Sequence, residues 1–346
     1  MLVRRAIPHD WCSVLSALPE DSLAPAWLHV PDDANDLPAT VWPASAKRDA
    51  DGALSIGGVS VSHLREQFGT PLYVLDEAEA RTHARGIHNA LSSAAQRHGT
   101  TARVYYAGKA FLSTEVVRWV TSEGLRVDVC SRGELETALA AGVDPAHIGY
   151  HGNNKRVSEL ERAVEVGVGS IIVDSEVETE RIAEIAARRG VVQQVMVRVN
   201  TGIHAETHDF LATAHEDQKF GVPLELAPAR VARIRELPSL LFLGAHCHIG
   251  SQIFGSAGFA QSAARMVELY AQLLEGGDVP LLNLGGGFGI AYTRVDQLTP
   301  FDELAGAIVD AVAQECQARN LALPELAFEP GRAVIGQAGV LSLIHI

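Results

Sequence analysis

Short apolar segments alternate with amphipathic segments from Pro71 onward, and this alternation constrains the fold more than any other feature of the chain. The apolar segments have the composition of strands: PLYVLD, ARVYYAGK, RVDVCS, HIGYHG, SIIVDS, QVMVRVN, LFLGAHCHIG, LLNLGGGFG and LAFEPGR. The segments between them, such as STEVVRWVTSEG and RGELETALAAG, carry apolar residues at helical spacing and often end on glycine. Repeated strand–helix units leave two main choices, a TIM barrel or an open doubly wound sheet.

Polar or glycine-rich residues follow most of the predicted strands. They are Lys109, Asp128, Asn153, Asn154, Asp174, Arg198, His248, Gly285 to Gly287 and Glu329 to Arg332. In a barrel the carboxyl ends of all strands meet on one face, where active sites are built, whereas an open sheet concentrates its site at one switch point. The sequence therefore predicts an α/β fold with a TIM (β/α)8 barrel, and the first predicted strand is expected to lie outside it.

The composition narrows the class of protein. The chain has 346 residues and a formal net charge of −14, which argues against a nucleic-acid-binding surface. No apolar run approaches the roughly 20 residues of a membrane helix, and the N-terminus lacks the apolar core of a signal peptide. The four cysteines, Cys12, Cys130, Cys247 and Cys316, show no paired spacing. We therefore expect a cytoplasmic protein that binds neither nucleic acid nor membrane.

Lys109 ends an apolar strand-like segment. In a strand Tyr105, Ala107 and Lys109 share one face, so the lysine is expected to point into the barrel. An ammonium there is costly unless it is paired, or unless its pKa is depressed so that the amine acts as a nucleophile. A lysine at the rim, with its stem buried and its charge in water, is the alternative that this residue alone leaves open.

The segment GAHCHIGSQ places His246 and His248 on one face of a strand, with Ser251 just beyond its end. Such a pair can bind a metal, stack an imidazole on an aromatic cofactor, or lie in the core as hydrogen-bonded histidines. A metal needs further ligands, and no carboxylate at another strand end completes an obvious set. We therefore expect no metal.

Two further segments favour an anionic ligand. Gly285, Gly286 and Gly287 directly follow a strand, so their N–H groups can cradle a phosphate, although a tight structural turn explains them equally well. In FEPGR, Glu329 could hold a proton on a heterocyclic nitrogen, and Arg332 could bind a carboxylate or phosphate. A salt bridge at the rim is the alternative for this pair. Together with Lys109 and a stacking histidine, these residues match the requirements of pyridoxal phosphate.

These segments resemble the fold-type III pyridoxal-phosphate-dependent decarboxylases, and among them the diaminopimelate decarboxylase branch. The matching segments run in the family's order from about Ser55 to Val340: YYAGKAFLSTEV, LRVDVCSRGEL, HGNNK, IIVDS, AHEDQKFGV, HCHIGSQIF, LGGGFGI and EPGRAV. HGNNK, EDQKFG and HIGSQ together are typical of this branch, whereas ornithine and arginine decarboxylases usually differ at the first two.

The resemblance implies a role for each matching residue. Lys109 forms a Schiff base with the cofactor and is displaced by the amine of an amino-acid substrate, while His248 stacks on the cofactor ring. Glu329 keeps the pyridine nitrogen protonated, and Asp128 supports this network through His248. Arg332 contacts the phosphate or the distal carboxylate of the substrate. The implied cofactor-binding residues are Lys109, Asp128, His248, Ser251, Gly285, Gly286, Gly287, Glu329, Pro330, Gly331 and Arg332.

The resemblance also implies a homodimer and a second, β-rich domain. We expect residues 1–60 to form an arm and strands of that domain, residues 61–335 the pyridoxal-phosphate-binding barrel, and residues 336–346 the start of the C-terminal part. Within the first range, the strand-like segment ALSIGGVSV predicts a small hairpin around Gly57 and Gly58. The family continues past E-P-G-R, and Leu341 to Ile346 no longer match, so we expect a truncated chain.

The expected reaction is decarboxylation of meso-2,6-diaminopimelate to L-lysine, impaired in this chain. A non-catalytic pyridoxal-phosphate-binding barrel, an ornithine- or arginine-type decarboxylase, and a metal-dependent hydrolase using His246 and His248 are the alternatives.

Overall fold

The computed structural model describes residues 33, 35–203 and 220–342, and those from Pro38 onward belong to one compact unit. Most of the arm predicted for residues 1–60, most of the AHEDQKFGV segment and residues 343–346 lie outside the described residues. Cys12 lies outside them as well, while Cys130, Cys247 and Cys316 are free thiols. No helix in the described part of the chain is long and apolar enough to cross a membrane.

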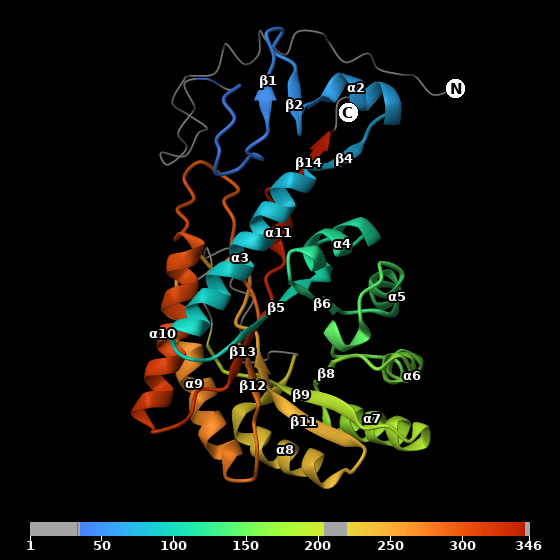
Figure 1. The fold of residues 1–346 in the computed structure, drawn as a ribbon, viewed down its shortest axis with the longest axis vertical. Helices are drawn as coiled ribbons and strands as arrows, with labels where there is room; N and C mark the ends of the chain where they lie inside the picture. Colours follow the sequence, from blue (N-terminus) through green and yellow to red (C-terminus); the bar gives the residue numbers. More distant parts are fainter. Residues whose placement is uncertain (1–32, 34, 204–219, 343–346) are drawn as a thin grey trace, which may run out of the picture. The chain divides into compact units, whose positions relative to one another are not determined.

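Eight parallel strands in the described part of the chain close into a barrel (Figure 1). They are β5 (Ala102–Ala107), β6 (Arg126–Val129), β7 (Ile148–Tyr150), β8 (Ser170–Val173), β9 (Gln193–Asn200), β11 (Leu240–Cys247), β12 (Leu281–Asn283) and β13 (Glu325–Phe328). Each pairs with the next, and β13 pairs with β5 to close the ring. A short β10 (Val222–Pro223) pairs with β9. The TIM barrel is thus confirmed, and the open sheet is wrong.

Helices follow the strands around the outside of the barrel (Figure 1). They are α3 (Glu77–Arg97), α4 (Thr114–Ser122), α5 (Arg132–Ala140), α6 (Val157–Val166), α7 (Glu176–Arg189), α8 (Ala227–Glu236), α9 (Ala257–Leu274), α10 (Phe301–Ala318) and α11 (Arg332–Ile335). Short 3-10 turns form η1 (Gly108–Ala110), η2 (Pro145–His147) and η4 (Leu224–Leu226). The larger apolar core lies between strands and helices, because the outward residues of the strands and the apolar helix faces are buried together.

Two small sheets stand apart from the barrel strands. β1 (Lys47–Arg48), β2 (Leu54–Ile56) and β3 (Val59–Ser60) pair antiparallel, and α2 (Val61–Phe68) follows. Gly57 and Gly58 join β2 to β3 with φ angles of 56° and 81°, which confirms the predicted hairpin because both positions favour glycine. β4 (Leu72–Leu75) pairs antiparallel with β14 (Gly339–Ser342), so the first strand predicted from the alternation lies outside the barrel, as expected.

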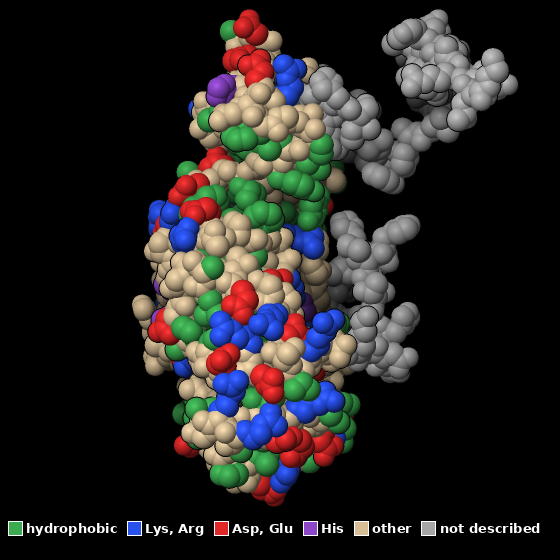
Figure 2. All heavy atoms as spheres, turned by 90° about the vertical axis from the view of Figure 1, so that its right-hand side faces the viewer, with side chains coloured by type: hydrophobic (Ala, Val, Ile, Leu, Met, Phe, Trp, Pro, Cys, Tyr) green, Lys and Arg blue, Asp and Glu red, His purple; other side chains and the backbone are tan. Residues whose placement is uncertain are grey.

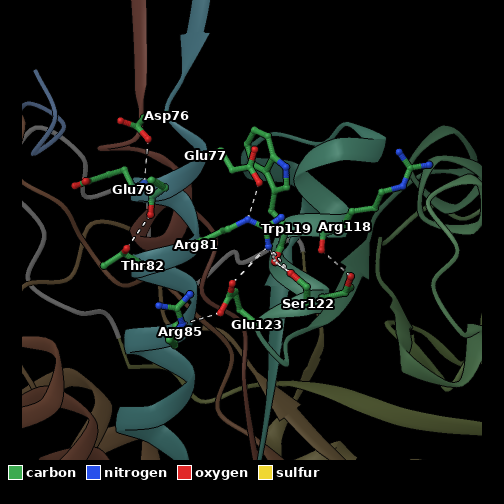
Figure 3. Close-up of polar contacts among 12 residues, drawn as sticks. Asp76, Glu77, Glu79, Arg81, Thr82, Arg85, Arg118, Trp119, Ser122 and Glu123 are labelled. Atoms are coloured by element: carbon green, nitrogen blue, oxygen red, sulfur yellow. Dashed lines mark hydrogen bonds and ion pairs between the residues drawn. The ribbon is translucent and has the colours of Figure 1, made fainter. Parts of the chain in front are cut away.

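Polar contacts fasten α3 to the end of α4 (Figure 3). The Arg81 guanidinium lies 2.7 Å from Glu77 and 3.4 Å from Glu123, and it also donates to the Ser122 hydroxyl. Arg85 reaches the same carboxylate at 2.8 Å, and its hydrogen bond lowers the pKa of Glu123. Because α4 begins just after η1, these contacts help to fix the helix that follows Lys109.

Charged side chains of both signs intermix on the face that carries α4 to α7 (Figure 2). Successive outer helices are bridged by Arg162–Glu136 at 2.9 Å, Arg188–Glu161 at 3.3 Å and Arg233–Glu180 at 2.7 Å. Exposed pairs of this kind each contribute about 0–1 kcal/mol, so the buried core remains the main source of stability.

Candidate active site

The interior of the barrel has an apolar layer. Six inward side chains form a cluster separate from the outer core: Tyr105, Ile172, Met196, Leu243, Leu281 and Ala327. Two residues further along the chain from three of these side chains lie Arg198 on β9, Asn283 on β12 and Glu329 just after β13. The apolar layer therefore supports a polar layer at the carboxyl end of the barrel, which is the end that carries active sites in this fold.

Glu329 is the centre of the polar layer and is buried. One of its oxygens lies 3.1 Å from His246 Nε2 and 3.3 Å from His151 Nε2, and it accepts a 2.6 Å hydrogen bond from Asn283. Burial alone would raise the pKa of Glu329, but the two imidazoles hold it well below its usual value. The carboxylate therefore stays negative in the interior of the protein.

Asp128 and His151 form the second half of this cluster. Asp128 Oδ1 lies 3.3 Å from His151 Nε2. Burial and the charge of Glu329 raise the pKa of Asp128 to about 7. Burial lowers the pKa of His151, but Glu329 and Asp128 outweigh it and raise that pKa to about 9. His151 is therefore a cation held between two carboxyl groups.

This arrangement corrects the expected role of Asp128. Among the described residues Asp128 contacts His151, not His248. His151 was not among the predicted site residues, although it begins the HGNNK segment that directly follows β7. The signal that could have found it is its position at a strand end, two residues before the predicted polar residues Asn153 and Asn154.

The two histidines of β11 lie in different surroundings. His246 is buried beside Glu329, and burial lowers its pKa to about 4. His248 is half-buried, its Nδ1 accepts a 3.4 Å hydrogen bond from the Gly286 amide, and burial with the charge of Lys109 lowers its pKa to about 3. Both rings are neutral at neutral pH. His151, His246 and Glu329 each offer a ligand atom within 4.8 Å of the others, but they already pair with one another, and we assign no metal to them.

The glycine turn after β12 packs tightly against neighbouring strand ends. Gly285 and Gly287 have φ angles of 69° and 106°, which favour glycine. A Cβ on Gly285, Gly286 or Gly287 would lie 2.3, 2.0 or 2.5 Å from the carbonyl oxygens of Cys247, Glu329 and Gly250, respectively. The glycines are therefore needed for a tight structural turn. This does not exclude phosphate binding by their N–H groups, because the same packing places the turn beside the polar layer.

Arg332 lies near the same turn. Its guanidinium donates to Ser251 Oγ at 3.2 Å, to the Tyr292 hydroxyl at 2.8 Å and to Gln252 Oε1 at 3.3 Å. Ser251 is exposed, so its hydroxyl and the guanidinium present donors to the opening of the barrel. Gln252 and Tyr292 were not predicted.

The Pro330–Gly331 segment lies against the end of β5. The Pro330 carbonyl accepts a 3.0 Å hydrogen bond from the Ala107 amide, and a Cβ on Gly331 would lie 3.1 Å from that of Ala107. We had expected Lys109 to continue the strand, but β5 ends at Ala107 and the lysine lies in the 3-10 turn η1. It is exposed, and its charge opposes the rise in the pKa of Asp128, while burial and the same charge lower the pKa of His248. The lysine is thus at the carboxyl end of the barrel, over the polar layer.

These residues fit pyridoxal phosphate. The buried atoms Asp128 Oδ2 and His246 Nδ1 make no hydrogen bond within the described part of the chain, so they can still bind a polar group placed beside Glu329. The glycine turn carries no side chains, and the exposed Lys109 acts by its charge on His248, which accepts a hydrogen bond from the Gly286 amide of this turn. The profile of a family described as pyridoxal-dependent decarboxylase, pyridoxal binding domain, matches residues 84–336. By class, the protein is a pyridoxal-dependent decarboxylase with a TIM barrel, and pyridoxal phosphate is its cofactor.

Comparison with sequence relatives shows which pyridoxal-dependent decarboxylases the chain is similar to. The chain is 43% identical to a diaminopimelate decarboxylase of Mycobacterium leprae over 91% of this chain and 67% of the relative. It is 42% identical to one of Mycobacterium tuberculosis over 90% of this chain and 69% of the relative. The chain thus spans about two thirds of the length of these relatives.

A solved structure agrees with these relatives. The crystal structure of diaminopimelate decarboxylase from M. jannaschii in complex with L-lysine superposes with a TM-score of 0.77 at 30% identity, covering 86% of this chain and 69% of that one. The chain belongs to the diaminopimelate decarboxylase family.

Proposed function

We propose that this chain catalyses the pyridoxal-phosphate-dependent decarboxylation of meso-2,6-diaminopimelate to L-lysine and carbon dioxide. The observation that carries the proposal is the negative Glu329, buried between two histidines below Lys109 and beside the glycine turn. The names of the relatives, and the L-lysine in the M. jannaschii complex, support the choice of substrate.

Different residues of the proposed site would bind different parts of the cofactor. Lys109 would attach it covalently through its amine, and His248 would offer a neutral ring to stack against it. Ser251, Gly285, Gly286 and Gly287 would bind the phosphate with hydroxyl and amide donors. When bound, pyridoxal phosphate supplies the electron sink that allows a carboxylate to leave as carbon dioxide.

The polar layer controls the proton at the ring nitrogen. Because its pKa is depressed, Glu329 stays charged and would stabilise a proton on a nitrogen placed against it. His151 and His246 keep Glu329 ionised, and Asn283 fixes its orientation. Asp128 would act on this group through His151.

Arg332 has two candidate partners in the proposed site, the phosphate and the distal carboxylate of the substrate. Its 3.2 Å contact with Ser251 supports the phosphate, because Ser251 is itself a proposed phosphate ligand. Pro330 and Gly331 would place this arginine by their packing on the end of β5.

The assembly and location of the protein are proposed from the family resemblance. A homodimer is expected, and light scattering of the purified chain tests it. A cytoplasmic location agrees with the free cysteines of the described residues, and cell fractionation tests it. We also propose that β1 to β3, within residues 1–60, and β14, within residues 336–346, belong to a second, β-rich domain.

Covalent labelling tests the cofactor assignment. Borohydride reduction of the protein mixed with pyridoxal phosphate should place a pyridoxyl label on Lys109, identified by peptide mass spectrometry. The variant Lys109→Ala should lose the label and the visible absorbance, while Lys47→Ala, which removes an exposed lysine of β1, should keep both. Label and absorbance that persist unchanged in Lys109→Ala would refute the assignment.

The substrate is tested by release of carbon dioxide. Turnover of meso-2,6-diaminopimelate above that of ornithine and arginine supports the proposed reaction. Faster turnover of either of the other two would indicate a related decarboxylase, and cofactor binding without turnover of any would indicate a non-catalytic barrel.

A further inference from the structure

Lys155 is a buried cation outside the polar layer. Its side chain is 2% exposed, and its ammonium donates to the Gly152 carbonyl, the Ile172 carbonyl and Glu178 Oε1, each at 2.7 Å. An ammonium has three N–H donors, so these contacts use all of them. They connect the segment after β7 to the end of β8 and to the start of α7.

Glu178 receives this cation while it also caps α7. Its amide donates to Ser175 Oγ at 3.3 Å, and its second oxygen accepts from the Asp174 amide at 2.8 Å. Glu134 makes the same two bonds at the start of α5, to Ser131 and Cys130, yet no Lys or Arg of the described residues forms an ion pair with it. Capping alone therefore does not require the lysine.

The lysine instead holds the short segment that carries His151. The His151 amide donates to the Val129 carbonyl at 2.8 Å, which fixes one end of the segment to β6. Gly152 follows with a φ of 122°, and its carbonyl is one of the three acceptors of Lys155. The ammonium thus fixes the other end of the segment, at Gly152, the residue that follows His151 in the chain.

We propose that Lys155, held by Glu178, is a positioning residue that fixes His151 between the carboxyl groups of Asp128 and Glu329. Burying an ion pair costs several kcal/mol of desolvation, and an apolar pair of similar volume is often at least as stable. A role in positioning accounts for a charged pair here, because only the ammonium can bind the three oxygens at once. The consequence for catalysis rests on the proposed function, whereas the geometry of the ligand-free protein does not.

The groups that face His151 come from three strands. Asp128 on β6 and Glu329 just after β13 each lie 3.3 Å from it, and the His246 ring of β11 lies 5.1 Å away between centroids. The charge of Lys109 acts on Asp128. A displaced imidazole loses one or both carboxyl partners, so its titration reports its position.

The test is the titration of His151 by NMR in ligand-free protein with isotope-labelled histidine. In the wild type we expect a pKa of about 9. The pKa of His151 should fall by about one unit or more in Lys155→Met. It should fall equally in the double variant Lys155→Met/Glu178→Met, which leaves no unpaired charge. Arg233→Met, which removes an exposed ion pair between α7 and α8, should leave it unchanged.

Two results would overturn the proposal. One is an unchanged titration of His151 in a folded variant. The other is a double variant that does not fold while Arg233→Met does, because the pair would then support the whole barrel and not one segment. Release of carbon dioxide by the wild type is measured separately, so failure of the proposed function leaves this test intact.

Discussion

Replacing Gly149 by alanine should disturb the active site without replacing any charged residue. Gly149 lies opposite Asp128 in the pairing of β6 with β7. A Cβ at this position would lie 2.2 Å from Asp128 Oδ1, well inside the ~3.5 Å of an ordinary contact. The φ of Gly149 is outside the left-handed region, so alanine can adopt the backbone conformation and the clash is the only perturbation.

The cost follows from how the clash is relieved. The strand cannot move far because both of its neighbours pair with it, so the carboxyl group of Asp128 must rotate away. Overpacking costs about 1–3 kcal/mol, and breaking a buried ion pair costs about 3–5 kcal/mol when a full charge is left unpaired. Because the pKa of Asp128 is about 7, protonation relieves part of that charge. We expect the free energy of unfolding to fall by about 2–4 kcal/mol.

Urea unfolding followed by circular dichroism measures this loss, and NMR follows the titration of His151. Gly133→Ala in α5 is the matched control, since its Cβ would lie 3.9 Å from Ser131 Oγ and alanine should stabilise a helix by about 0.5–1 kcal/mol. The double variant Gly149→Ala/Asp128→Ala should lose less stability than the two single losses combined, because the second change makes room for the first. Wild-type stability together with an unchanged titration in Gly149→Ala would refute the reasoning.

Two further predictions concern the same end of the barrel. The pKa of His151 is raised from 6.5 to about 9, so the contribution of this residue to stability is complete below pH 6.5 and is lost as the pH rises through 9. The free energy of unfolding of the ligand-free protein should therefore decline over this pH range, and the decline should be smaller in His151→Asn. A Cβ on Gly286 would lie 2.0 Å from the Glu329 carbonyl, so Gly286→Ala should displace the turn and weaken pyridoxal phosphate binding tenfold or more (about 1.4 kcal/mol). Equilibrium dialysis measures this loss against Gly255→Ala, whose Cβ meets nothing within 4 Å, and equal affinities would contradict it.

The barrel could be predicted from the sequence because its signal is repeated. Each strand–helix unit carries the same apolar periodicity, so an error in one unit does not change the fold class. Polar residues at strand ends were also reliable indicators of position, since the carboxyl ends of parallel strands meet on one face. The hairpin at Gly57 and Gly58 could be predicted for a local reason, the need for positive φ at both residues.

The partners within the polar layer could not be predicted in the same way. The partner of Asp128 depends on the register of β6 with β7 and on the direction of the segment that follows β7. The apolar periodicity of the sequence predicts neither of these. Lys109 was placed on the strand face, but β5 ends at Ala107, whose amide bonds to Pro330 far along the chain. Contacts between distant segments decided both points, and a single sequence carries no record of them.

In the proposed function the ionisation state of Glu329 is set mainly by the neighbouring histidines. A carboxyl group buried in the interior would ordinarily become neutral, because burial raises its pKa. His151 and His246 reverse this, and they are supplied by β7 and β11, which do not pair with each other and are brought together only by closure of the barrel. Asp128, beside the same imidazole, has its pKa raised to about 7, so it is only partly ionised at pH 7. One carboxyl group is thus kept charged to stabilise a proton on a ring nitrogen, while the other is free to share a proton with His151. That division requires the His151 segment to be held in place, which is why a buried lysine away from the cofactor can govern the chemistry.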